Sequence, residues 1–171
     1  MGSRGANFGR DYLKELSRLA TARRANPAFG NLAIISGDER QTRLLLAVIR
    51  SLLGYDATVR TARTLGLGLD LIITDPPQLI LLDDQLTSQD KAQSVIPILR
   101  RCGFKGPIIA LTASLTLCTE RELTLAGADD VIDRDELSTV RLAEALAAGF
   151  TAGAIGETRQ FSAVTDLRDF K

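Results

Sequence analysis

One short apolar run that ends in two carboxylates constrains the fold of this chain more than any other stretch. It reads LILLDDQL and covers residues 79–86, with Pro76 and Pro77 just before it. An unbroken apolar run of this length is typical of a strand that is buried on both faces of a parallel sheet. Asp83 and Asp84 come at the carboxyl end of this strand. In open α/β sheets, ligand and reaction sites gather at that end, so we expect the functional site around Asp83.

Short apolar strands and amphipathic helices alternate along most of the chain. The expected strands cover residues 32–35, 57–59, 79–82, 107–111 and 131–132. The clearest helices are expected at about residues 38–53, 90–101, 119–126 and 137–148. Strands that alternate with helices predict parallel pairing and right-handed crossovers. The fold class is therefore α/β: a doubly wound, five-stranded parallel sheet, (βα)5, with helices on both faces.

Capping residues predict where two of these helices begin and end. Asp38, with Gln41 three residues later, resembles a capping box, and Gly54 ends the helix that follows. Thr119, with Glu122 three residues later, predicts the start of another helix, and Gly127 ends that helix.

The segment Leu65 to Ile73 has two interpretations. Residues 69–73, followed by Asp75, resemble a strand that ends in a carboxylate and so imitates residues 79–86. The alternative is a helix, which Gly66 and Gly68 would weaken. We favour the helix, because two adjacent buried strands joined by a short proline turn would break the strand–helix alternation.

The 171 residues accommodate one domain with two extensions. Residues 1–29 form a basic extension that predicts a helix over 10–25, residues 30–149 form the α/β domain, and residues 150–171 form a C-terminal tail. The N-terminal helix is interpreted as docked on the domain or as pairing with a second copy of the chain. A nucleic-acid-binding arm is the sharper alternative, but interleaved aromatic residues are missing, and we do not expect nucleic-acid binding.

Composition excludes several function classes. The chain contains no histidine, which removes Ser–His–Asp and Cys–His catalysis and zinc sites with histidine ligands. Cys102 and Cys118 are too few for a disulfide framework, and both are expected to be at least partly buried. No glycine-rich phosphate loop follows the first strand, and no apolar stretch reaches membrane-spanning length. We therefore expect a cytoplasmic protein without enzymatic activity and without membrane contacts.

Three polar residues end three different strands: Asp83, Thr112 and Arg134. Together with the five strand–helix units, they resemble the receiver domain of two-component response regulators over about residues 31–149. The segments that carry the resemblance are LILLDDQL, PIIALTA and GADDVIDRDEL. Each segment alone is a weak signal, whereas all three in this order and at this spacing are specific.

The resemblance implies a phosphorelay role. Asp83 would be the phosphoacceptor, receiving a phosphoryl group from a histidine kinase or a phosphotransfer protein. The hydroxyl of Thr112 and the guanidinium of Arg134 would contact the phosphate. A Mg²⁺ ion held by Asp83 and by carboxylates after the first strand would neutralise the gathering charge. A downstream protein partner would respond to the modified state.

The sequence departs from the family pattern at the metal site and at the switch. Ser36 and Gly37 stand where the family has an acidic pair, so we expect Mg²⁺ binding to be weak or absent. Asp38 is the remaining acidic candidate there, although a helix cap explains it more simply. Arg134 replaces the family lysine, and it either contacts phosphate or pairs permanently with a nearby acid. Val131 replaces the aromatic switch residue, which predicts only a modest phosphorylation-dependent shift.

Two functional hypotheses follow. In the first, which we favour, the chain is an atypical response regulator receiver that accepts phosphate on Asp83 and acts through protein–protein contacts. In the second, it is a phosphorylation-independent pseudo-receiver module that regulates a histidine kinase or another partner. Asp83 and Thr112 favour the first hypothesis, whereas Ser36, Gly37 and Arg134 favour the second.

Overall fold

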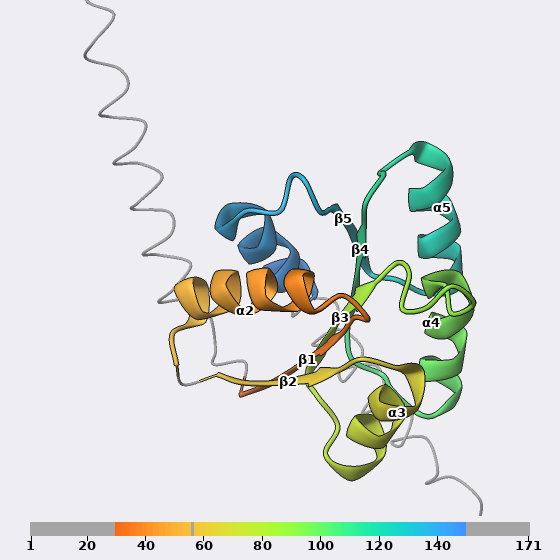
Figure 1. The fold of residues 1–171 in the computed structure, drawn as a ribbon, viewed down its shortest axis with the longest axis horizontal. Coiled ribbons are helices and arrows are strands. Elements are labelled where there is room, and N and C mark those ends of the chain that lie inside the picture. Colours follow the sequence, from red (N-terminus) through yellow and green to blue (C-terminus); the bar gives the residue numbers. More distant parts are fainter. Residues whose placement is uncertain (1–29, 56, 150–171) are drawn as a thin grey trace, which may run out of the picture.

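The computed structural model describes residues 30–55 and 57–149. The helix predicted over residues 10–25 and the C-terminal tail lie outside these described residues. Within them, strands and helices alternate along the chain (Figure 1). The elements are β1 (Asn31–Ile35), α2 (Glu39–Leu53), β2 (Thr58–Ala62), α3 (Leu65–Thr74), β3 (Leu79–Asp83), α4 (Ala92–Arg101), β4 (Ile108–Thr112), α5 (Leu117–Ala126) and β5 (Asp130–Asp133). A last helix follows β5, and its described part covers residues 139–149.

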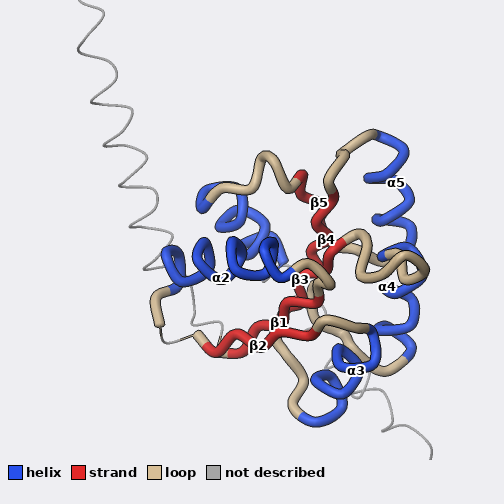
Figure 2. The backbone as a smooth tube through the Cα atoms, in the orientation of Figure 1, coloured by secondary structure: helices blue, strands red, loops and turns tan. Residues whose placement is uncertain are grey.

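The five strands form one parallel sheet in the order β2-β1-β3-β4-β5. Figure 2 shows β3 in the middle of this sheet, between β1 and β4. All five residues of β3 are buried, which explains why the four residues before Asp83 form an unbroken apolar run. The predicted doubly wound α/β architecture is therefore confirmed. The second strand runs further than predicted, because it pairs with the whole length of β1.

Two hydrophobic clusters cover the two faces of the sheet. Alternate residues of each strand point to opposite faces, so Leu81 and Leu82 belong to different clusters. Leu81 shares its cluster with Leu45 of α2 and with Leu142 of the last helix. Leu82 lies in the cluster that contains buried side chains of α3, α4 and α5. Figure 1 shows the same layering, with α2 and the last helix on one face and the other three helices opposite.

The cap of α2 is confirmed, whereas the predicted cap of α5 is wrong. Asp38 Oδ1 accepts hydrogen bonds from the backbone N–H groups of Arg40, at 2.8 Å, and Gln41, at 3.2 Å. In α5 the cap is Thr116, because the backbone is still extended there and its hydroxyl accepts from the N–H of Thr119 at 3.1 Å. Thr119 therefore lies in the first turn rather than before it.

The ambiguous segment forms the helix α3, as favoured from its sequence. Gly68 is buried in this helix and faces β1. A Cβ atom on Gly68 would lie 2.8 Å from Cδ1 of Ile35, so the glycine lets the helix approach the strand closely. Glycine lowers the helix propensity at this position, but the close packing of α3 against β1 explains why glycine is there.

The two cysteines differ from expectation, since Cys102 and Cys118 are both exposed. None of the helices in the described ranges is long and apolar enough to cross a membrane.

Candidate functional site at the carboxyl edge of the sheet

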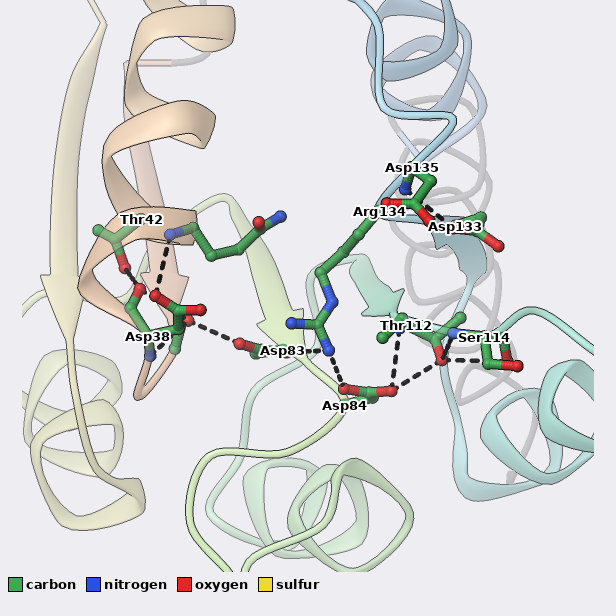
Figure 3. A network of polar contacts seen from close by, with 12 residues as sticks. Asp38, Thr42, Asp83, Asp84, Thr112, Ser114, Asp133, Arg134 and Asp135 are labelled. Carbon is green, nitrogen blue, oxygen red and sulfur yellow. Dashed lines mark hydrogen bonds and ion pairs between the residues drawn. The ribbon is translucent and has the colours of Figure 1, made fainter.

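The carboxyl ends of four strands bring polar side chains together. Asp83 and Thr112 are the last residues of β3 and β4, while Ser36 and Arg134 directly follow β1 and β5. Parallel strands end at the same edge of the sheet, so these residues meet although they are far apart in sequence. Figure 3 shows the side chain of Arg134 reaching from the end of β5 toward Asp83 and Asp84.

Asp83 is the most deeply buried acid of the site. Its exposed fraction is 1%, and its Oδ2 accepts a hydrogen bond from Ser36 Oγ at 2.7 Å. Its Oδ1 lies 3.4 Å from Nη2 of Arg134 and has no hydrogen-bond partner among the described residues. The structure therefore brings Asp83 and Arg134 together, as predicted, but at ion-pair distance rather than in a direct hydrogen bond.

Asp84 makes the closer contacts. Its Oδ1 accepts a hydrogen bond from Nη2 of Arg134 at 2.7 Å. Its Oδ2 accepts one from the hydroxyl of Thr112 at 2.7 Å and a longer one from the N–H of Ala113 at 3.3 Å. Thr112, predicted to act with Asp83, thus donates to Asp84. Asp84 and Ser36 were not among the predicted contacts of the site, although the doubled aspartate at a strand end and the hydroxyl after β1 are both visible in the sequence.

One guanidinium faces two carboxylates in this site. Burial raises the pKa of Asp83 above its ordinary value, and the neighbouring Asp84 adds to this effect. The hydrogen bond from Ser36 and the charge of Arg134 lower the pKa of Asp83, but the net direction is upward. Ser36 is a neutral donor and Arg134 is shared, so the charged form of Asp83 is incompletely compensated.

The contacts around the expected magnesium site leave few oxygen ligands free for that ion. The hydroxyl of Ser36 is bound to Asp83, and Asp38 Oδ1 caps α2. A Cβ atom on Gly37 would lie 2.0 Å from the carbonyl oxygen of Leu86, so no side chain has room there. Mg²⁺ needs several oxygen ligands in octahedral geometry. Over residues 30–55 and 57–149, no three acidic, cysteine or histidine side chains are grouped to hold a metal. The metal roles predicted for Asp83 and Asp38 remain predictions.

Val131, predicted to stand at the aromatic switch position of receiver domains, is buried in the cluster on the α3–α4–α5 face of the sheet. Its side chain fills core space, so the position holds an ordinary packing residue. The modest switching predicted from this substitution remains a prediction.

Solved structures of receiver domains resemble the fold of this chain. The signal receiver domain of a DNA-binding response regulator (merR) from Colwellia psychrerythraea 34H aligns with a TM-score of 0.59 at 21% identity, covering 68% of this chain and 94% of that one. The receiver domain of the Francisella response regulator 1452 aligns with a TM-score of 0.59 at 18% identity, covering 71% and 98%. The signal receiver domain of a modulated diguanylate cyclase from Desulfovibrio desulfuricans G20 reaches 0.62 at 16% identity, covering 73% and 96%.

This chain has the receiver-domain fold. The resemblance predicted from sequence is confirmed at the level of the fold, and the similarity spans nearly the whole of each of these receiver domains. No protein-family model matches the sequence, and no curated protein matches it.

Proposed function

We propose that this chain is a receiver-type signal-transduction module that acts through protein–protein contacts without phosphorylation of Asp83. The observation that carries the proposal is the hydrogen bond from Ser36 to Asp83 at a position where phosphoryl transfer needs a metal-binding carboxylate. A histidine kinase or another signalling protein is the expected partner. The receiver fold supports a role in signalling, and the altered site supports independence from phosphate.

Charge argues for this proposal. Phosphoryl transfer to a carboxylate gathers negative charge, which enzymes neutralise with Mg²⁺ and with positioned cations. At this site Arg134 already faces two carboxylates, and it lies closer to Asp84 than to Asp83. An incoming phosphoryl group would add negative charge to two carboxylates that already share the guanidinium of Arg134.

Access argues in the same direction. A nucleophilic carboxylate must present an oxygen to the donor phosphorus. Asp83 is almost fully buried, and one of its oxygens is held by Ser36. The other oxygen faces the guanidinium of Arg134. Phosphorylation would first have to expose one of these two oxygens to the donor phosphorus.

A second candidate function is phosphate acceptance on Asp83 from a histidine kinase or phosphotransfer protein. The specific observation in its favour is the position of Arg134 Nη2, 3.4 Å from the unpartnered Oδ1 of Asp83. A cation at this distance would pair with an acyl phosphate formed on that oxygen.

Intact-mass measurement distinguishes the two candidates. The full chain is incubated with acetyl phosphate, with and without Mg²⁺, beside the Asp83→Asn variant. We expect no phosphoryl adduct on either protein. An Mg²⁺-dependent adduct on the wild type that is absent from Asp83→Asn would overturn the proposal and support the second candidate.

The protein-contact part of the proposal needs a binding measurement. Calorimetry with histidine kinase domains would compare wild type and Asp83→Asn, before and after treatment with acetyl phosphate. We expect at least one kinase domain to bind, with an affinity that neither the substitution nor the treatment changes by more than about threefold, or roughly 0.7 kcal/mol. Binding that requires treatment of the wild type would contradict phosphate independence.

A further inference from the structure

Three hydrogen-bond donors from two segments of the chain converge on the carboxylate of Asp84. Thr112 contributes its hydroxyl at the end of β4, Ala113 its backbone N–H in the following loop, and Arg134 its guanidinium after β5. Figure 3 shows Asp84 between Arg134 on one side and Thr112 on the other. A hydroxyl, a backbone N–H and a guanidinium are the donors that proteins use to hold oxyanions.

We propose that these donors form an oxyanion site that Asp84 occupies as an intramolecular ligand. A tetrahedral oxyanion such as inorganic phosphate would take the same donors once the carboxylate of Asp84 is removed. This inference rests on the proposed function, because an internal anion would keep the site engaged without phosphorylation of Asp83.

The backbone holds Asp84 where its side chain meets the donors. The N–H of Asp84 donates to the carbonyl of Leu111 at 2.8 Å, and its carbonyl accepts from the N–H of Ala92 at 2.9 Å. With both backbone groups bonded, the carboxylate is presented at high effective concentration and without a large ordering cost. A free anion therefore competes poorly for the donors in the wild type.

The geometry identifies Asp84, rather than Asp83, as the internal ligand. Arg134 Nη2 lies 2.7 Å from Asp84 Oδ1 but 3.4 Å from Asp83 Oδ1. Asp84 also accepts hydrogen bonds from the hydroxyl of Thr112 and the N–H of Ala113. In contrast, Oδ1 of the buried Asp83 has no hydrogen-bond partner among the described residues.

Occupation of the site also holds the loop between β4 and α5. Thr112 Oγ1 donates to Asp84 and accepts from the N–H of Ser114 at 3.2 Å. The backbone N–H of Leu115 donates to Oδ2 of Asp133 at 3.3 Å. The carboxylate of Asp84 is thus linked through Thr112 to the segment that leads into α5.

The test measures binding of inorganic phosphate by calorimetry in a chloride background of constant ionic strength. The full chain is compared with Asp84→Ala and with Asp130→Ala. Asp130 is the matched control, because it is also an aspartate paired with an arginine: its Oδ1 lies 2.9 Å from Arg141 Nη2. It stands at the start of β5, away from Arg134, and no hydrogen bond from a hydroxyl to its carboxylate is found among the described residues. We expect phosphate to bind Asp84→Ala at least tenfold more tightly than wild type and Asp130→Ala.

A second substitution shows whether phosphate takes the inferred donors. In the Asp84→Ala background, Thr112→Val and Arg134→Gln should each remove most of the gain. A natively folded Asp84→Ala without tighter phosphate binding would overturn the inference, and so would a gain that survives both second substitutions. If Asp84→Ala does not fold, Asp84→Asn serves instead, with the same expected direction.

These outcomes are independent of the test of the proposed function. Phosphate binding to Asp84→Ala is non-covalent and needs no modification of Asp83. Labelling of wild-type Asp83 by acetyl phosphate would overturn the proposed function. The calorimetric comparison of phosphate binding to Asp84→Ala and wild type would still decide the role of Asp84.

Discussion

The hydroxyl of Ser36 donates to Asp83 across β1 and β3, with 2.7 Å between Ser36 Oγ and Asp83 Oδ2. Both residues are buried, with exposed fractions of 2% and 1%. The same hydroxyl accepts from the backbone N–H of Asp38 at 3.2 Å. Ser36 therefore connects the buried acid of β3 to the start of α2.

Removing this hydroxyl should destabilise the fold. In Ser36→Ala, both oxygens of Asp83 would lack a hydrogen-bond donor, and a buried unsatisfied polar group costs about 1–3 kcal/mol. We expect the free energy of unfolding from denaturant titrations at neutral pH to fall by about this amount. Ser88→Ala, in an exposed turn, is the control and should lie within about 0.5 kcal/mol of wild type. Equal stability of Ser36→Ala and wild type would show that the hydrogen bond contributes nothing.

Asp83→Asn should change how stability depends on pH. Burial raises the pKa of Asp83 in the folded state above its ordinary value of 3.8, so the folded protein holds the proton more tightly than the unfolded chain. The wild type therefore loses stability as pH rises from about that ordinary value through the raised pKa, and it retains the full contribution below both. Asn has no such transition.

The measurement is the difference in free energy of unfolding between Asp83→Asn and wild type across this pH range. We expect the difference to shift in favour of the variant as pH rises. Asp70→Asn, at an exposed position of α3, is the control and should not reproduce this shift. A constant difference across the range would contradict the raised pKa of Asp83.

The sequence predicted the features that depend on local patterns. The apolar run of β3, the cap at Asp38 and the strand-end positions of Asp83, Thr112 and Arg134 are all visible in residue order. Which carboxylate each donor meets depends on strand twist and loop paths, and these place Thr112 on Asp84 rather than on Asp83. Sequence alone cannot separate two adjacent aspartates at this level.

The close approach at Gly37 was likewise invisible in the sequence. Nothing in the residue order shows that the carbonyl oxygen of Leu86 would lie 2.0 Å from a Cβ at position 37. The resemblance to receiver domains predicted that Ser36 and Gly37 replace an acidic pair, whereas the structure adds a steric reason for the glycine. Restoring an acidic pair at residues 36 and 37 would therefore disturb the backbone as well as the charge.

Gly37→Ala should be destabilising. The added methyl group would collide with backbone rather than with a flexible side chain, and overpacking of this kind costs typically about 1–3 kcal/mol. Gly66→Ala is the matched control, since a Cβ there meets nothing within 4 Å and the residue lies in α3. We expect Gly66→Ala to equal or exceed wild type in stability, by up to about 1 kcal/mol. Thermal and denaturant unfolding of both variants tests this, and a neutral Gly37→Ala would show that the loop around Leu86 yields easily.

The last prediction concerns the metal. Mg²⁺ binding to the wild type is expected to be weak, because Ser36 is a neutral residue bound to Asp83 and Gly37 has no room for a side chain. Ser36→Asp alone places a second carboxylate beside Asp83 while leaving Gly37 unchanged. Without a cation these two acids repel each other, so the variant should be less stable than wild type at low ionic strength.

Added Mg²⁺ should reverse this loss in Ser36→Asp, because a ligand that binds only the folded state stabilises it in proportion to the logarithm of its concentration. We expect Mg²⁺ to bind the variant at least tenfold more tightly than wild type, which corresponds to about 1.4 kcal/mol. Ser36→Asn controls for side-chain size, since it adds the same bulk without the charge that the cation needs. Calorimetric titration and the shift in melting temperature with MgCl₂, against matched NaCl, provide the readouts. Tight binding by the wild type, or an equal response of Ser36→Asn and Ser36→Asp, would show that the carboxylate at position 36 does not control the metal.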